Sequence, residues 1–176
     1  MRSFTSRWRW SMAAVLLLAG CAKPPPPPPP PAPPPAPIPI GCTVDADEKV
    51  NPDIAGRPSP VAVKLFQLQT AGKFEAGDFF TLYRDAAAAL GPDLVASREV
   101  TVRPGEQKRF DEEIAPQTRF VGIVVGFRDV QNARWRAVVA VPATGLAQQA
   151  LEVRLAKLAA SASFVEAKAA ASGGPR

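Results

Sequence analysis

The chain has 176 residues, a formal net charge of +5 and no histidine. The absence of histidine excludes Ser-His-Asp and Cys-His catalysis and every metal site built on imidazole. Three of the 21 basic residues, Arg2, Arg7 and Arg9, lie in an N-terminal leader, so 18 remain against 16 acidic residues. Without a basic run or a basic strand studded with aromatic residues, nucleic acid is not an expected partner. The length suffices for one domain.

Residues 1–20 have the pattern of an export signal peptide. The three arginines precede an apolar run, residues 12–18, that is too short to span a bilayer as a mature helix. The run closes on Leu-Ala-Gly-Cys at residues 18–21, which resembles a bacterial lipobox. The resemblance implies cleavage before Cys21 and a lipid on that cysteine. An ordinary signal peptide with an unmodified cysteine is the alternative.

Lipidation of Cys21 implies a stable membrane anchor, because several acyl chains hold a protein where a single chain holds it only marginally. The next residue is Ala22, whereas an aspartate there would resemble a signal for retention in the inner membrane. We therefore expect a lipid anchor in the outer membrane, with the protein facing the periplasm.

Residues 21–40 are predicted to be the lipidated cysteine and a proline-rich spacer. Eight consecutive prolines occupy positions 24–31, and five more follow by Pro39. This composition favours polyproline II, and at about 3.1 Å per residue the segment 23–40 spans roughly 55 Å. The spacer would hold the folded domain away from the membrane; a docking site for a proline-reading domain is the alternative.

Residues 41–165 are predicted to form the folded domain. A weak alternation over 41–50 predicts a first strand, and a clear alternation from Val61 predicts a second. Between them, residues 51–60 hold three prolines and other turn formers, which predicts an exposed loop. Cys42 is expected to be a small buried hydrophobe, with an intermolecular disulfide as the alternative.

The alternation typical of strands is absent from residues 70–91, and their pattern predicts two or three short helical turns inserted between strands. Thr70 and Asp78 are candidate helix N-caps, and Gly91 is a candidate C′ residue, the one that follows the end of a helix. The aromatic residues of the insert are Phe74, Phe79, Phe80 and Tyr83. We expect these rings to pack the insert onto a sheet, with a ligand pocket as the alternative.

The second half of the domain returns to β patterns, beginning at Leu94. Pro and Gly in residues 103–106 meet the requirements of a type II turn, which predicts a hairpin between the flanking strands. Its return strand, 107–114, is charged and suits a sheet edge, while the apolar run 120–127 suits a central strand. Residues 151–155 alternate as a strand and also fit a helix.

One further strand is expected before Pro142. Its inward residues would be Trp135, Ala137, Val139 and Val141, and its outward residues Arg134 and Arg136. Six or seven short strands and one helical insert predict a mainly β protein, a two-sheet β-sandwich with a short helical insert. Residues 166–176 lack an apolar period and are predicted to be a disordered tail.

Motifs spread over residues 51–142 are, taken together and in order, similar to those of one family. They are Asn-Pro-Asp-x-x-Gly-Arg-Pro-Ser-Pro-Val from residue 51, Asp78-Phe79-Phe80-x-Leu82-Tyr83, Arg103-Pro104-Gly105-Glu106, Phe127-Arg128-Asp129 and Ala133-Arg134-Trp135-Arg136-Ala137-Val138. The chain resembles the TssJ lipoproteins of type VI secretion. The resemblance implies a transthyretin-like β-sandwich on the outer membrane. It also implies binding to the periplasmic C-terminal domain of TssM, an inner-membrane protein that completes a trans-envelope complex with TssL.

In that family the loop between the first two strands is implicated in TssM binding, and residues 51–60 match it. The implied partner-binding residues are Asn51, Pro52, Asp53, Ile54, Gly56, Arg57, Pro58, Ser59 and Pro60. Prolines reduce the conformational freedom lost on docking, and the planar guanidinium of Arg57 suits interface carboxylates. Alternatively, Asp53 and Arg57 only staple the loop to its own domain.

Two other classes of protein stay open. A periplasmic small-ligand carrier would bind its ligand between Phe79, Tyr83 and Trp135. An enzyme would use paired carboxylates such as Asp111 and Glu113, although beside another glutamate these look like solubility residues. No cofactor is expected, because the chain has neither a phosphate-cradling glycine loop nor a metal-ligand cluster. The leading interpretation is a non-enzymatic adaptor that fixes the secretion complex to the outer membrane.

Overall fold

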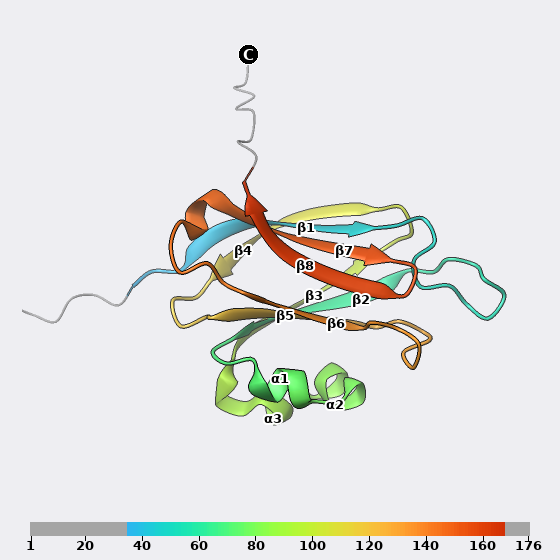
Figure 1. Cartoon of the computed structure of the whole chain (residues 1–176), viewed down its shortest axis with the longest axis horizontal. Helices are drawn as coiled ribbons and strands as arrows, with labels where there is room; N and C mark the ends of the chain where they lie inside the picture. Colours follow the sequence, from blue (N-terminus) through green and yellow to red (C-terminus); the bar gives the residue numbers. More distant parts are fainter. Residues whose placement is uncertain (1–34, 168–176) are drawn as a thin grey trace, which may run out of the picture. The chain divides into compact units, whose positions relative to one another are not determined.

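The computed structural model describes residues 35–167. The signal peptide predicted over 1–20, Cys21, the spacer up to residue 34 and the tail from residue 168 lie outside the described residues. Eight strands form two four-stranded sheets, and three short helices lie on the outer face of one sheet (Figure 1). The mainly β, two-sheet transthyretin-like sandwich with a helical insert is confirmed, with more strands than predicted.

The first sheet has the strand order β4-β1-β7-β8. β1 (Ile38–Ala46) is antiparallel to β4 (Gln107–Ile114) and parallel to β7 (Gln149–Ala156). β1 begins three residues before the predicted strand, inside the segment predicted to be spacer. Pro39 is tolerated there because β7 pairs with β1 only from Gly41 onward, so no ladder hydrogen bond on that side is lost at the proline.

The last strand of this sheet, β8 (Ala159–Glu166), is absent from the sequence prediction. It pairs antiparallel with β7 along its whole length, so the helical alternative for residues 151–155 is wrong. Ala160, Ala162 and Phe164 face the core. Alanine and serine at most positions give β8 a weak hydrophobic alternation, and its pairing with β7 supplies the order that composition does not predict.

The second sheet has the order β3-β2-β5-β6. Its members are β2 (Val61–Leu68), β3 (Leu94–Val102), β5 (Phe120–Val125) and β6 (Arg136–Ala140), all antiparallel. β5 is an internal strand as predicted, although it ends at Val125. β4 is an edge strand, also as predicted, but of the other sheet.

The predicted hairpin between β3 and β4 is wrong. The turn itself forms, since Gly105 has φ +72° and the Glu106 amide donates to the Arg103 carbonyl at 3.0 Å. The turn nevertheless carries the chain from one sheet to the other, because β3 pairs with β2 and β4 pairs with β1. Turn residues specify that the chain reverses its direction. Which strand pairs with which depends instead on how the two faces of each strand are buried.

The main core lies between the sheets and contains Cys42, which is 3% exposed. The expectation of a small buried hydrophobe is confirmed. Burial raises the pKa of its thiol to about 12, with the nearby Glu112 carboxylate adding to the shift.

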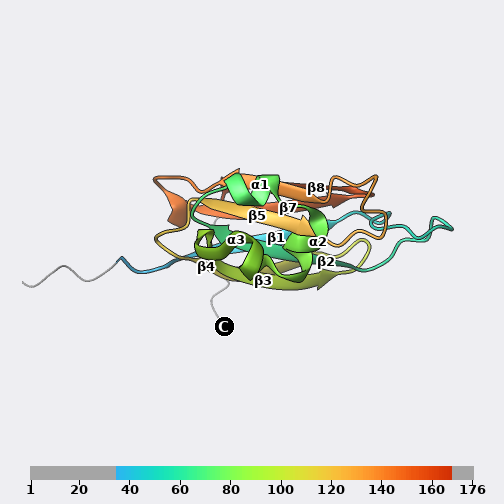
Figure 2. The ribbon, with the colours of Figure 1, turned by 90° about the horizontal axis from the view of Figure 1, so that it is seen from below.

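The three helices are α1 (Gly72–Ala76), α2 (Phe79–Arg84) and α3 (Ala86–Leu90), and they cover the outer face of the second sheet (Figure 2). Two 3-10 turns, Gly91–Asp93 and Leu146–Gln148, complete the fold. A second apolar cluster lies between these helices and the sheet: Phe66, Leu68, Phe74, Leu82, Leu90 and Val124.

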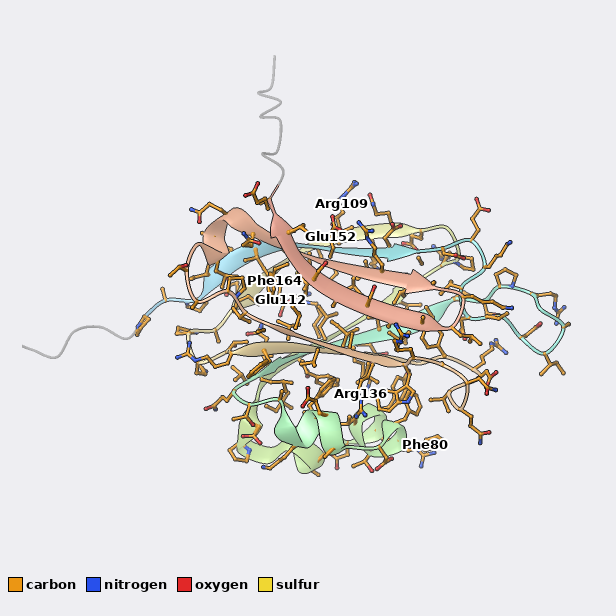
Figure 3. The ribbon with its side chains drawn as sticks, in the orientation of Figure 1. Phe80, Arg109, Glu112, Arg136, Glu152 and Phe164 are labelled. Carbon is orange, nitrogen blue, oxygen red and sulfur yellow. The ribbon has the colours of Figure 1, made fainter. Side chains whose placement is uncertain are left out.

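The predicted caps have different outcomes. Asp78 is an N-cap whose carboxylate accepts from the Thr81 amide at 3.0 Å, while the N-cap of α1 is Ala71 and not Thr70. Arg136, predicted to face outward, lies between the second sheet and the helices (Figure 3). Its guanidinium donates to the carbonyls of Phe74 and Gly77 at 3.1 and 2.9 Å. The outward face of β6 is therefore covered by the helical layer.

Candidate functional site

The loop 51–60 lies at one end of the sandwich, and the chain enters the domain at the other end. β1 connects these ends, beginning near the first described residues and ending just before the loop (Figure 1). Nine residues of strand span about 30 Å at roughly 3.3 Å per residue. The loop therefore lies at the end of the domain opposite to the first described residues.

The loop tip is closed on itself by Asp53 and Arg57. The Asp53 carboxylate accepts from the backbone amides of Ala55 and Arg57, each at 2.9 Å, and pairs with the Arg57 guanidinium at 2.8 Å. Hydrogen bonds from Arg57 hold the pKa of Asp53 below its ordinary value. Gly56 has φ +79°, a conformation that favours glycine. The tip therefore has a defined shape without a partner.

This staple between Asp53 and Arg57 leaves the apex of the loop free. Ile54 is fully exposed, and the side chain of Arg57 remains 80% exposed despite its ion pair. Asp53 and Arg57 therefore bond to each other within the loop tip, whereas the alternative expected them to staple the loop to the rest of the domain. This staple fixes the direction in which both side chains are presented.

The base of the loop is held by Asn51, which was predicted to touch a partner but is only 2% exposed. Its side chain donates to the Pro60 carbonyl and accepts from the Arg128 amide, both at 2.8 Å, and its own amide donates to the Lys157 carbonyl at 2.9 Å. Ser59 is also buried. Both residues therefore support the loop from inside the domain, and the exposed surface belongs to the residues between them and to Pro60.

Two neighbouring turns complete a cleft beside the loop, which we call the loop cleft. One turn follows β5 and the other joins β7 to β8. The cleft has a volume of about 780 Å³ and is lined by Pro52, Asp53, Ile54, Gly56, Arg57, Arg128, Asp129, Lys157 and Leu158. Arg128 belongs to one of the motifs above, whereas Lys157 gave no signal because the β7–β8 turn was not predicted.

The aromatic residues proposed for a ligand carrier pack on one another. Phe79 stacks on Tyr83 with ring centroids 5.1 Å apart, and meets Trp135 edge-on at 5.3 Å. The contacts thus join two rings of α2 to the ring of the residue just before β6. Phe80, on the outer side of the helical layer, is 56% exposed (Figure 3).

The candidate catalytic carboxylates are not assembled into a site. Asp111 and Glu113 are exposed on the outer face of β4, opposite Gly41 and Pro39 of β1. Glu112, between them, is buried, accepts from Gln67 at 2.9 Å and forms an ion pair with Arg98. Within residues 35–167, no three His, Cys, Asp or Glu side chains gather as metal ligands would. No helix in the same range has the length and hydropathy needed to cross a membrane.

Fold and loop together define a class: a small β-sandwich that presents a preorganised loop at one end. The family profile described as Type VI secretion lipoprotein, VasD, EvfM, TssJ (T6SS-SciN) matches residues 39–158. The chain belongs to this family.

Solved structures share this fold. The T6SS lipoprotein TssJ1 from Pseudomonas aeruginosa is 32% identical, with a TM-score of 0.69 over 74% of this chain and 98% of that one. Serratia marcescens Lip, a membrane-bound component of the Type VI secretion system, is 22% identical, with a TM-score of 0.64 and the same coverage. A chain in the structure of the TssM C-terminal domain from EAEC is 21% identical, with a TM-score of 0.56. The match covers 73% of this chain and 98% of that one. Among curated proteins, none matches this chain.

Proposed function

We propose that this protein is a non-enzymatic adaptor that fixes the type VI secretion membrane complex to the outer membrane. It binds the periplasmic C-terminal domain of TssM through loop 51–60, in a complex that also contains TssL. Membership of the Type VI secretion lipoprotein family supports this role. The similar fold of a chain in a TssM C-terminal domain structure is consistent with it.

The observation that carries the proposal is the stapled loop tip with Ile54 at its apex. A loop already held in one conformation loses little conformational entropy on binding. A fully exposed isoleucine on such a loop offers apolar area that a partner can bury. The loop therefore has the rigidity and the exposed anchor that a binding surface needs, whereas the carrier and enzyme candidates lack an assembled site.

Anchoring is proposed to come from Cys21. The lipobox-like tetrapeptide supports a lipidated cysteine at the start of the mature chain, and the proline-rich segment after it would set the distance to the domain. Incorporation of labelled palmitate into the full chain, lost in Cys21→Ser, tests this part. Sedimentation of the unmodified chain with outer-membrane fractions tests the location.

The partner is tested by titrating the full chain, purified in detergent, with the C-terminal periplasmic domain of TssM from the same genome. We expect saturable one-to-one binding that is weakened when residues 53–57 are replaced by a Gly/Ser segment. A matched control replaces the exposed Pro116 and Gln117, at the other end of the sandwich, by Gly and Ser. No saturable binding between two folded partners would overturn the proposal.

A further inference from the structure

We infer that the loop cleft is an interaction surface for an acidic, extended segment of the protein partner. This inference rests on the proposed function and names the chemistry of the segment that the cleft receives. It adds Arg128 and Lys157, from two other turns, to a site expected on loop 51–60 alone.

Some of the charged side chains around the loop cleft have a partner within the domain, and others have none among the ion pairs of the described residues. The carboxylate of Asp53 is engaged by Arg57, and that of Asp129 accepts from the Asn132 side chain at 3.0 Å. Arg128 and Lys157 are both exposed, and the ion pairs found within residues 35–167 include neither of them. The lining of the cleft thus holds three cations, Arg57, Arg128 and Lys157, against two carboxylates, Asp53 and Asp129, and so carries an excess positive charge that an incoming carboxylate can meet.

The backbone at both Arg128 and Lys157 is held by Asn51, the residue that also holds the loop. The Arg128 amide and the Lys157 carbonyl both bond to Asn51. The buried Asn51 thus joins the loop to the backbone of Arg128 and of Lys157. These bonds fix the spacing of the backbone positions that carry the two cations. A partner carboxylate meets a surface whose backbone does not have to rearrange.

Apolar groups flank the cations. Ile54 is fully exposed on the loop, and Leu158, which also lines the cleft, is half-buried against the core. A segment lying in the cleft would bury apolar side chains on these residues while its carboxylates meet Arg128 and Lys157. This combination fits an acidic peptide segment with interspersed apolar residues better than a small anion.

A protein segment is favoured over anionic lipid head groups by the position of the cleft. The chain enters the domain at the end opposite to loop 51–60 (Figure 1). An N-terminal lipid anchor thus joins the domain at the end remote from the cleft. The cleft is suited to a partner that approaches from the other side.

The test uses the full chain in detergent and the C-terminal periplasmic domain of TssM. Arg128→Glu with Lys157→Glu is compared with Arg119→Glu, an exposed arginine near the opposite end of the sandwich. We expect the double reversal to raise Kd by at least about tenfold at low salt, mainly through slower association, because charges at an interface rim act on encounter. The control should bind as the unmodified chain does.

Arg128→Gln with Lys157→Gln provides a second variant that adds no like charge. Its affinity should fall less between 50 and 500 mM salt than that of the unmodified chain. If the unmodified chain binds and both double variants match it at every salt concentration, the inference is overturned while the proposed function stands. If the unmodified chain does not bind at all, the proposed function fails and the inference with it. Binding of the Cys21→Ser chain to anionic phosphatidylglycerol vesicles, lost when Arg128 and Lys157 are also replaced, would also overturn the inference.

Discussion

The side-chain oxygen of Asn51 accepts a hydrogen bond from the backbone amide of Arg128, at 2.8 Å and across 77 residues of sequence. The other end of the same side chain donates to the Pro60 carbonyl. Asn51 also adopts φ +50°, the only positive φ of a non-glycine residue between residues 35 and 167. A single buried amide therefore joins the base of the loop to the turn that follows β5.

Asn51→Gly tests this attachment, because glycine keeps the positive φ and removes only the side-chain bonds. Leaving two part-buried backbone groups without their Asn51 partner should lower the free energy of unfolding by about 1 to 3 kcal/mol. Urea denaturation measures the loss, and Asn132→Ala, which removes exposed hydrogen bonds alone, is the control. A loss no larger than that of the control would contradict the role of Asn51.

The staple between Asp53 and Arg57 predicts a pH dependence of the loop tip. Arg57 lowers the pKa of Asp53 from its ordinary 3.8, so the folded state binds this proton more weakly than the unfolded state. The staple is thus fully present above pH 3.8 and is lost as the pH falls below that value. An NMR titration of the Asp53 carboxyl carbon should show a midpoint below 3.8, moving upward in Arg57→Gln. A midpoint at the ordinary value in both proteins would rule out the staple in solution.

Gly122 in β5 is predicted to be intolerant of a side chain. A Cβ at this position would lie 2.7 Å from the Phe74 ring, so Gly122→Ala should cost about 1 to 3 kcal/mol through overpacking. Gly41→Ala is a matched control on β1, where no atom lies within 4 Å of the added carbon. Adding Phe74→Leu to Gly122→Ala should recover part of the loss. Equal stability of the two alanine variants, measured by chemical denaturation, is the contrary result.

Cys42 is predicted to be unreactive in the folded protein. Its thiol is buried and its pKa is raised to about 12, so the thiolate that attacks disulfide reagents is almost absent at pH 8. A Cys21→Ser variant, in which Cys42 is the single thiol, should react with an aromatic disulfide reagent only after unfolding in urea. Rapid stoichiometric reaction in native buffer would contradict this prediction.

The same shift predicts a loss of stability at high pH. The ordinary pKa of the thiol is 9.0 and the folded value is about 12, so between these values the unfolded state releases a proton that the folded state keeps. The Cys42 contribution to stability is therefore present below pH 9 and declines as the pH rises toward 12. Relative to Cys42→Ala, the unmodified chain should lose stability over this window.

The sequence by itself determined the local structure. Alternation of apolar residues predicted β2 and β7, Asp78 and Gly91 bounded much of the helical insert, and Pro104 with Gly105 predicted the turn that follows β3. The prolines and other turn formers of residues 51–60 also predicted an exposed loop. These features depend on backbone preferences within a few residues, which sequence patterns report directly.

Only the tertiary structure decided which segments meet. The turn after β3 leads to another sheet, β8 is ordered by its pairing with β7, and Arg136 lies between the second sheet and the helices instead of in water. The loop cleft likewise joins Asn51 to Arg128 and Lys157, which are far from it in sequence. Such contacts follow from the joint burial of distant faces and from pairing of buried polar groups, and neither leaves a local pattern in the chain.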